Sequence, residues 1–409
     1  MVKPFNKTSV CILVIFGIFL NQSDVILGVN ISIADLFFIL ILFLLLLQNR
    51  IKFHKQAILF FLLLTALLFY TSLYHVPKQL LYYPSPSSVM TNYIKLLTVF
   101  MYFVVGCSLS MGENEIIIRW YSHAAAVIGA SGFLLAFFNA ELFSHTFFYG
   151  GLRLKGLMND PNYFSIIQNT AIAYFSRKRS MKKIFSAGII VILVLSIMAS
   201  GSKTGLIILI SYTIIRIFES LITVKFTLKA VIVHILLLIP VIMSVLFIAD
   251  ILPDVLEIMS DKLPALRRIQ LLFTDFDKAV SDMGSNRDLT WEAALGLIKR
   301  SPVLGIGIGT YSGLAKKLYN TSLVAHNTYL QLFSEWGILL ALTLFIYLFL
   351  VITKVSFNKE NYQDLTVVLK DMLMIFMIGS LAVSLNNARM FWLFLGMLVT
   401  DVHNQKVLV

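Results

Sequence analysis

A small set of cationic and imidazole side chains lies near the ends of apolar segments in this chain. The set is Arg153, Lys155, Lys203, Arg287, His326 and Arg389, with Asn327 beside the histidine. Guanidinium and ammonium groups pair with phosphate or carboxylate, and imidazole exchanges a proton near neutral pH. A charge at a hydrocarbon boundary costs roughly 1–3 kcal/mol unless it is paired or hydrated. If these residues share one side of a membrane, they indicate a site for an anion.

The densest polar stretch is "GLRLKGLMNDPNYFS", residues 151–165. It places Arg153, Lys155, Asn159, Asp160 and Asn162 close together at the start of an apolar segment. A simple connection between two membrane helices does not need this much polarity. The function of the stretch depends on which side of the membrane it faces.

The composition indicates a membrane protein. The 409 residues are 58% hydrophobic and only 13% charged, whereas about a quarter of the residues in a soluble domain are charged. The apolar residues recur in blocks near the length of about 20 residues that crosses a bilayer as a helix. The sequence therefore predicts an all-α polytopic membrane protein.

We expect twelve transmembrane helices. Their predicted spans are near residues 9–28, 33–47, 57–74, 92–110, 121–139, 161–176, 184–200, 204–219, 228–249, 328–352, 365–385 and 388–402. The first span follows Lys3 and Lys7 as a signal peptide would, but no small-residue cleavage site follows it, so we expect it to remain as a helix.

The basic residues give the orientation. With Lys3 and Lys7, the clusters at residues 50–55, 177–183, 225–229 and 354–359 all fall on one side of this arrangement. Positive residues mark the cytoplasmic side, so both termini are predicted to be cytoplasmic. The same distribution explains the net charge of +12 without a nucleic-acid partner.

One long hydrophilic segment, residues 250–327, is predicted to lie outside. The expected organisation is helices 1–9 over residues 1–249, an extracytoplasmic loop domain over 250–327, and helices 10–12 over 328–409. Two stretches of the loop, "LPDVLEIMSDKLPALRRIQLLF" and "DLTWEAALGLIKR", have apolar residues at helical spacing. Each predicts a short amphipathic helix. The loop closes at "VAHNTYLQLFSEWG", where His326 and Asn327 open the next span.

This topology brings the cationic set to the outer face, although each member also has a purely structural interpretation. Arg153 and Arg389 could be interfacial anchors, Lys203 could hold a short turn, His326 could cap a helix, and Arg287 could pair with Asp288 or Glu292. The coincidence of all of them on one face favours an anion site.

Two glycine-containing motifs do not indicate nucleotide binding. "GSKTG" lacks the Gly-x4-Gly-Lys spacing of a phosphate-binding loop. "LGIGIGTY" lacks a flanking strand–turn–helix and is interpreted as a tight turn under a surface helix. The outer face has no acidic cluster for a divalent metal, and Cys11 and Cys107 fit a packing role. We therefore expect chemistry without a metal or another cofactor.

Four segments resemble the O-antigen ligase and polymerase superfamily of bacterial inner-membrane proteins. "RLKGLMNDPNYFS" is similar to its Arg-x-x-Gly…Pro-Asn segment, and "SGSKTGL" to its Ser-x-Arg-Thr segment. "NRDLTWEAALGLIKRSPVLGIGIGTY" and "AHNTYLQLFSEWGIL" are similar to its Arg…Trp…Gly-x-Gly and His-Asn segments. The resemblance covers about residues 150–340. It departs at Lys203, where the family commonly has Arg, so the planar guanidinium fork is missing there.

The resemblance implies transfer of a glycan from undecaprenyl diphosphate to an acceptor hydroxyl at the outer face of the inner membrane. His326 is then the expected base, and Arg287 is expected to act with it in catalysis. The expected substrate-binding residues are Arg153, Lys155, Asn162, Lys203, Asn327 and Arg389. Cations can stabilise a leaving diphosphate without a metal.

Within the family, the intact Asp-Pro-Asn segment favours a polymerase that makes O-antigen, capsule or exopolysaccharide. Its partners would be the lipid-linked oligosaccharide, the growing glycan acceptor and a chain-length regulator. A ligase that uses the lipid A core as acceptor is the alternative. A flippase or other transporter of lipid-linked oligosaccharides is the second alternative, although transporters tend to show internal repeats and midplane charges, which are not seen here.

Overall fold

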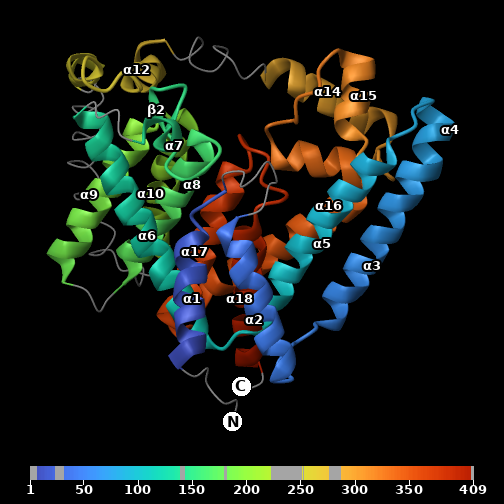
Figure 1. The fold of residues 1–409 in the computed structure, drawn as a ribbon, viewed down its shortest axis with the longest axis horizontal. Coiled ribbons are helices and arrows are strands. Elements are labelled where there is room, and N and C mark those ends of the chain that lie inside the picture. The colour runs from blue at the N-terminus through green and yellow to red at the C-terminus, as the bar shows by residue number, and fades with distance from the viewer. Residues whose placement is uncertain are drawn as a thin grey trace. The chain divides into compact units, whose positions relative to one another are not determined.

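The computed structural model describes residues 7–23, 32–138, 143–178, 182–222, 251, 253–275 and 287–406. These residues form helices almost throughout, with one two-stranded sheet among them (Figure 1). Four helical stretches are long and apolar enough to cross a membrane: Lys55–Leu80, Pro86–Ser108, Met111–Phe137 and Thr328–Phe357. Thr8–Phe19, Ile33–Leu47 and Lys183–Ala199 are shorter apolar helices. The prediction of an all-α membrane protein is confirmed at this level.

The number of membrane crossings stays a prediction. Among the described residues, the four stretches above meet both the length and the hydropathy expected of a full span. The predicted span at residues 228–249 lies outside the described residues.

The chain divides into two compact units. The first unit comprises Met1–Leu20, Ser32–Tyr121 and Met283–Val409, and the second comprises Asn21–Ile31 and Ser122–Asp282. The two units are defined by contacts between distant parts of the chain. The three predicted sections are defined by the expected membrane crossings, and they remain a prediction.

Helices account for nearly all described residues of the first unit. In chain order they are α1 (Lys7–Phe19), α2 (Ile33–Leu47), α3 (Lys55–Tyr70), the π-helical turn η1 (Thr71–His75), α4 (Val76–Leu80), α5 (Pro86–Ser108), the first part of α6 (Met111–Phe137), α14 (Arg287–Arg300), α15 (Tyr311–Tyr319), α16 (Thr328–Phe357), η2 (Lys359–Asn361), α17 (Asp364–Gly379) and α18 (Arg389–Lys406). Helices α5 and α18 pack closely because Gly106 and Gly396 face each other's backbones. Small residues allow such an approach between membrane helices.

The second unit contains the rest of α6 and a short hairpin. Its further elements are α7 (Ser144–Phe147), β1 (Phe148–Tyr149), β2 (Arg153–Leu154), α8 (Pro161–Arg177), α9 (Lys183–Ala199), α10 (Lys203–Ile222) and α12 (Leu266–Thr274). Strands β1 and β2 are antiparallel, with Phe148 opposite Leu154 and Tyr149 opposite Arg153. Most of α8 is buried. The hairpin, which carries Arg153, was not predicted from the sequence.

Both short helices that were predicted for the long loop have counterparts among the described residues. Helix α12 lies in the first amphipathic stretch and α14 in the second. Each buries its apolar face, with Leu266 and Ile269 buried in α12 and Ala294 and Leu297 in α14. Their 3.6-residue apolar spacing was therefore a valid signal.

The glycine-rich segment between α14 and α15 touches three helices. Gly305, Gly307 and Gly309 have φ angles of 68°, 77° and 73°, a region in which a Cβ atom is strained. A Cβ on Gly305 would meet the backbone at Glu335 of α16. One on Gly307 would meet Ser72 in η1, and one on Gly309 would meet Ser88 in α5. The predicted tight turn is thus a contact point for three helices.

Helix α16 is interrupted where this segment meets it. Gly337 has φ 76° and ψ 163°, which is not helical. The amide of Ile306 donates to the Ser334 carbonyl at 2.8 Å, and that of Ile338 donates to the Pro302 carbonyl at 2.8 Å. A break in an apolar helix leaves backbone groups without intrahelical partners. Here the glycine-rich segment supplies partners on both sides of the break.

Replacement of Gly307 by Ala tests this constraint. We expect Gly307→Ala to lower the free energy of unfolding by about 1–3 kcal/mol, because the left-handed backbone and the Ser72 contact both oppose a Cβ. Gly188→Ala in α9 is the matched control, since a Cβ there meets nothing within 4 Å. Thermal unfolding of both variants in detergent makes the comparison. Equal midpoints would contradict the packing role of Gly307.

Candidate functional site

The predicted site residues are shared between the two units. Arg153, Lys155, Asn162 and Lys203 belong to the second unit, and Arg287, His326, Asn327 and Arg389 belong to the first. Each group is described by itself.

Arg153 links the hairpin of the second unit to two helices. Its Nε donates to the Ser200 carbonyl at 3.0 Å, and its Nη2 donates to Asn162 Oδ1 at 3.3 Å. Ser200 follows the last turn of α9, where carbonyl groups carry partial negative charge. The guanidinium is therefore held by a helix C-terminus and by an amide, and its side chain is only partly exposed.

Asn162 is the centre of this arrangement. Its Oδ1 accepts from Arg153 and also from Ser202 Oγ at 2.8 Å. Ser202 Oγ in turn accepts from Ser165 Oγ and from the Gly205 amide, each at 3.0 Å. The start of α8 is thus bonded to the start of α10. The Asn162 Oδ1 atom therefore both binds the Arg153 guanidinium and helps to join the two helices.

The Asp-Pro-Asn segment has a local structural explanation. Asp160 caps α8 by accepting from the Asn162 amide at 2.8 Å and the Tyr163 amide at 3.0 Å. Pro161 occupies the first helical position, where its missing N–H and fixed φ suit a helix start. Each residue of the segment therefore helps to orient Asn162.

Arg268 of α12 is a cation near Arg153 that was not predicted to belong to the site. Burial, and next the charge of Arg268, lower the pKa of Arg153 to about 10, against the opposite effects of Asp160 and Tyr149. Arg153 thus remains cationic at neutral pH. Arg268 Nε is buried and has no hydrogen-bond partner among the described residues. Two cations in close range favour an anion between or beside them.

Lys155 and Lys203 are both partly buried. The backbone amide of Lys155 donates to the Phe147 carbonyl at 2.8 Å, which ties it to the hairpin. Lys203 is the first residue of α10. Its ammonium sits at the positive end of a helix dipole, where a cation is unfavourable without a nearby negative group. Both side chains make further interactions within the protein.

In the first unit, the turn between α17 and α18 accepts hydrogen bonds from Arg287 and from a residue next to the His326–Asn327 pair. Arg287 Nη2 donates to the Ala382 carbonyl at 3.3 Å. Thr328, two residues after His326, bonds the same turn through its amide to Ser380 at 2.8 Å and through its hydroxyl to Val383 at 2.7 Å. The Arg287 side chain and Thr328, which follows the His326–Asn327 pair, therefore bond to the same turn.

His326 lies at the start of α16, as predicted. The capping side chain is that of Asn327, whose Oδ1 accepts from the Leu330 amide at 3.1 Å. His326 does not cap the helix but has a φ of 48°, which is uncommon for a residue other than glycine. Its imidazole is partly buried. The neighbouring Ala325 amide donates to Gln331 Oε1 at 3.1 Å, which orients the chain just before the histidine.

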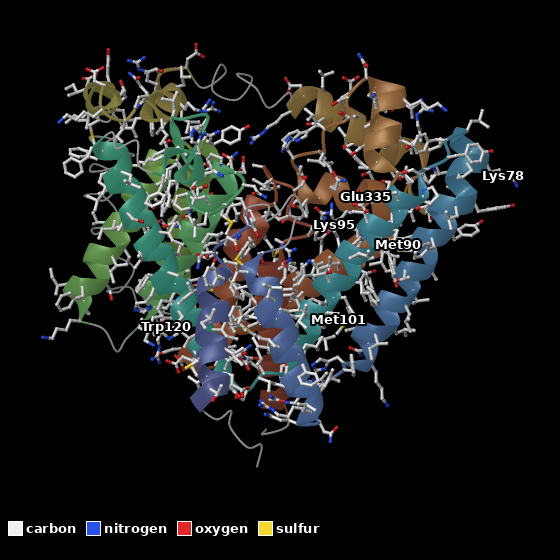
Figure 2. All side chains as sticks on the ribbon, in the orientation of Figure 1. Lys78, Met90, Lys95, Met101, Trp120 and Glu335 are labelled. Atoms are coloured by element: carbon white, nitrogen blue, oxygen red, sulfur yellow. The ribbon has the colours of Figure 1, made fainter. Side chains whose placement is uncertain are left out.

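Gln331 and Glu335 extend this arrangement along α16 and were missed from the sequence. Gln331 Nε2 donates to Glu335 Oε1. Lys95 of α5 is close enough to act on the Glu335 carboxylate electrostatically (Figure 2). Glu335 is the lone acidic residue between positions 328 and 352. An acid within an apolar span is a functional signal in its own right, so it could have been found.

Arg389 has a carboxylate partner. Its Nε lies 2.7 Å from Asp35 Oδ1, which also accepts from the Tyr102 hydroxyl at 2.8 Å. Asp35 additionally accepts from Ser32 at the start of α2. A substrate anion would have to compete with Asp35 for this guanidinium. The predicted binding role of Arg389 stays a prediction.

Comparison with known families bears on both units. Residues 188–345 match the family model described as O-antigen ligase. The match supports the O-antigen ligase and polymerase superfamily. It includes Lys203, Arg287, His326 and Asn327, so the matched part of this O-antigen ligase-like chain carries both predicted catalytic residues. No curated protein matches the chain.

The pair of Asp35 and Arg389 allows a test of its role. We expect Asp35→Asn and Arg389→Gln each to lower the free energy of unfolding by about 1–3 kcal/mol, since each leaves a partly buried charge without its partner. The double variant should lose less than the sum of the single losses. Thermal unfolding measures stability, and glycan transfer measured well below the midpoint separates the two roles. If only Arg389→Gln abolishes transfer, Arg389 contacts substrate, whereas equal transfer in both single variants makes the pair structural.

Proposed function

We propose that this protein transfers a glycan from undecaprenyl diphosphate to an acceptor hydroxyl without a metal ion. The observation that carries the proposal is that Arg287 and Thr328, the residue after the His326–Asn327 pair, both bond to the turn of residues 380–385. Arg287, His326 and Thr328 all lie within the residues that match the O-antigen ligase family model. This pairs a proton acceptor with a cation that cannot lose its charge near neutral pH.

In the proposed reaction, His326 accepts the proton of the acceptor hydroxyl as that oxygen forms a bond to the anomeric carbon of the donor sugar. The bond from this carbon to the diphosphate oxygen breaks at the same time, and the electron pair leaves with the undecaprenyl diphosphate. Arg287 stabilises the negative charge that develops on the leaving group. The second unit has a cation pair of its own, Arg153 and Arg268, which suits a phosphate group, and Asn162 orients Arg153.

Polymerisation is the first form of this proposal. The acceptor would then be the non-reducing end of another lipid-linked repeat unit, and a chain-length regulator would be a partner. The Asp160–Pro161–Asn162 segment, which favoured a polymerase from the sequence, caps α8 in the structure. Ligation to the lipid A core is the second candidate, and the description of the matching family model favours it.

The basic clusters support a location in the bacterial inner membrane with both termini in the cytoplasm. On this arrangement the site faces outward, away from cytoplasmic nucleotides. The donor must therefore carry its own activated bond, and a sugar diphosphate lipid does so.

His326→Asn is the decisive variant. Asn tolerates the left-handed backbone that position 326 requires, but it cannot accept the proton. We expect the rate of transfer to fall by about 100-fold or more, with normal amounts of protein in the membrane. Polymer length on gels, with a purified lipid-linked repeat unit as donor and acceptor, gives the rate. A parallel reaction with lipid A core as the acceptor separates polymerase from ligase.

His145→Asn serves as the matched control, because it removes an exposed imidazole from α7 in the same predicted outer region. It should leave the transfer rate unchanged. If His326→Asn also retains near-normal transfer, His326 is structural and another group is the base.

The cations make a second prediction for the same assay. Arg153→Ala, Lys203→Ala and Arg287→Ala should each lower transfer by about 10-fold or more, because each removes charge that would stabilise the diphosphate. Lys203→Arg should be tolerated, since it keeps the charge at the start of α10. Arg119→Gln is the control, because it removes an exposed cation on the predicted cytoplasmic side. Full transfer by Arg287→Ala would mean that Arg287 has a structural role only, through its hydrogen bond to the Ala382 carbonyl.

A further inference from the structure

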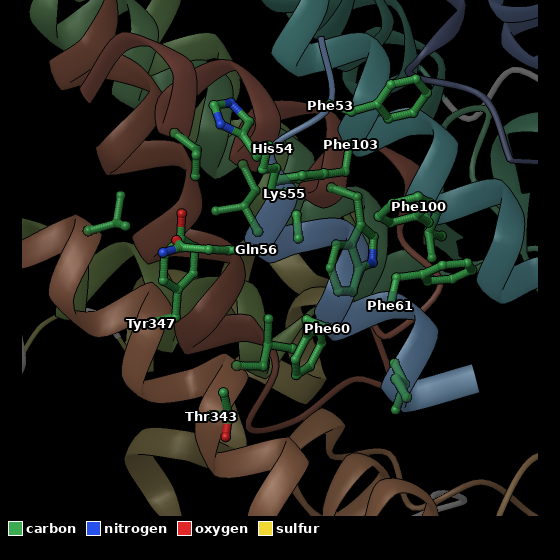
Figure 3. A pocket seen from close by; sticks show the side chains of 18 of the residues that line it. Phe53, His54, Lys55, Gln56, Phe60, Phe61, Phe100, Phe103, Thr343 and Tyr347 are labelled. Atoms are coloured by element: carbon green, nitrogen blue, oxygen red, sulfur yellow. The ribbon is translucent and has the colours of Figure 1, made fainter. Parts of the chain in front are cut away.

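An apolar groove in the first unit is not used by the proposed reaction. It has a volume of about 780 Å³ and is lined by α3, α5, α16 and α18 (Figure 3). Aromatic rings form much of its wall. Phe61 of α3 stacks on Phe100 of α5 with ring centroids 4.0 Å apart, and Phe60 lies 6.4 Å from Trp336 of α16. Such a surface suits hydrocarbon.

One end of the groove is basic. Lys55 at the start of α3 and Lys354 near the end of α16 line it together with His54 and His403. The two imidazoles meet edge to face, 5.5 Å apart, and His54 Nε2 lies 3.4 Å from Thr400 Oγ1. The lining residues include no Asp or Glu. The charges are therefore gathered at one end, and the remaining wall is apolar or uncharged.

The lysines supply this charge. Burial lowers the pKa of His54, and the nearby charges of His403 and Lys52 lower it further. His54 therefore contributes to the groove as a hydrogen-bonding group, and the positive charge comes from the lysines. Lys55 and Lys354 carry ammonium groups, which bind phosphate as point charges.

The dimensions fit a membrane lipid. Thr343 and Lys354 both line the groove, and the unbroken helix between them spans roughly 16 Å at 1.5 Å per residue, about the depth of one leaflet. The hydrocarbon layer of a bilayer is about 30 Å thick. The groove thus has room for acyl chains along α16 with a headgroup at the Lys354 end.

The basic end is remote from the proposed reaction. His326 precedes the first residue of α16, whereas Lys354 lies in its last turn. A lipid whose phosphate sits at Lys354 therefore cannot present that phosphate to His326. This separates the groove from the undecaprenyl diphosphate site.

We propose that this groove binds an anionic phospholipid from the membrane leaflet in which the basic end of the groove lies. The phosphate is held between Lys55 and Lys354, and the acyl chains lie along the aromatic wall. By the positive-inside rule this is the cytoplasmic leaflet, whose anionic lipids attract basic residues near the membrane surface. A zwitterionic phospholipid fits the wall equally well, but its own cation opposes the two lysines.

Native mass spectrometry of the full chain in detergent tests the proposal, with phosphatidylglycerol and phosphatidylcholine of identical acyl chains as probes. We expect phosphatidylglycerol to be retained at least 10-fold more strongly. Lys55→Gln combined with Lys354→Gln should remove this preference and leave phosphatidylcholine binding unchanged. Lys182→Gln combined with Lys183→Gln is the matched control, since it removes two exposed lysines from the start of α9, and it should keep the preference.

Two further variants distinguish a specific loss of lipid binding from misfolding. Ala57→Phe places a ring in the groove and should reduce the binding of both lipids. Lys55→Arg combined with Lys354→Arg keeps the charge and should keep the preference. The proposal is overturned if the glutamine variant binds phosphatidylglycerol as the unmodified protein does, or if Ala57→Phe leaves binding unchanged. It is also overturned if undecaprenyl phosphate displaces phosphatidylglycerol at equal concentration.

Discussion

The close approach of one glycine-rich segment to three helices is the constraint on which the first unit depends. Gly305, Gly307 and Gly309 alternate along this segment, and each lies against a different helix. Side chains at these positions would separate α3, α5 and α16, because protein interiors hold few voids and resist added volume. The glycines are therefore explained by packing, and no nucleotide needs to be invoked. The break at Gly337 belongs to the same constraint, since the Val303 carbonyl occupies the space that a Cβ would need.

Polar bonds play the corresponding role in the second unit. Asn162 accepts from a cation on one side and from a serine that joins α8 to α10 on the other. A buried network of this kind is stable only when its members are satisfied. The polarity of the stretch at residues 151–165 thus has two causes. Part of it builds a helix junction, and the charge of Arg153, with Arg268 beside it, remains available to act on an anion.

Local signals in the sequence predicted local structure well. The start of α16 near Asn327 and the loop helices α12 and α14 were predicted from nearby residues. The cap at Asp160 is also a local feature, although it was not predicted. Interactions between distant residues were not predictable in this way. Asp35 and Arg389 are 354 positions apart in the chain, and nothing near either residue indicates the other. Arg268 near Arg153 and the contact of Gly307 with Ser72 are of the same kind, because they arise only when separate elements pack.

The interrupted helix α16 has a mechanical consequence for the site at its start. Beyond Gly337 the long apolar part of the helix can tilt to match the thickness of the surrounding bilayer, as membrane helices commonly do. The short part before the break is held by Thr328 and by the glycine-rich segment. The same segment also bonds Ile338, the first residue beyond the break, through the Pro302 carbonyl. The start of α16, where His326 lies, is therefore positioned by neighbouring loops, and the tilt of the long apolar part does not set it.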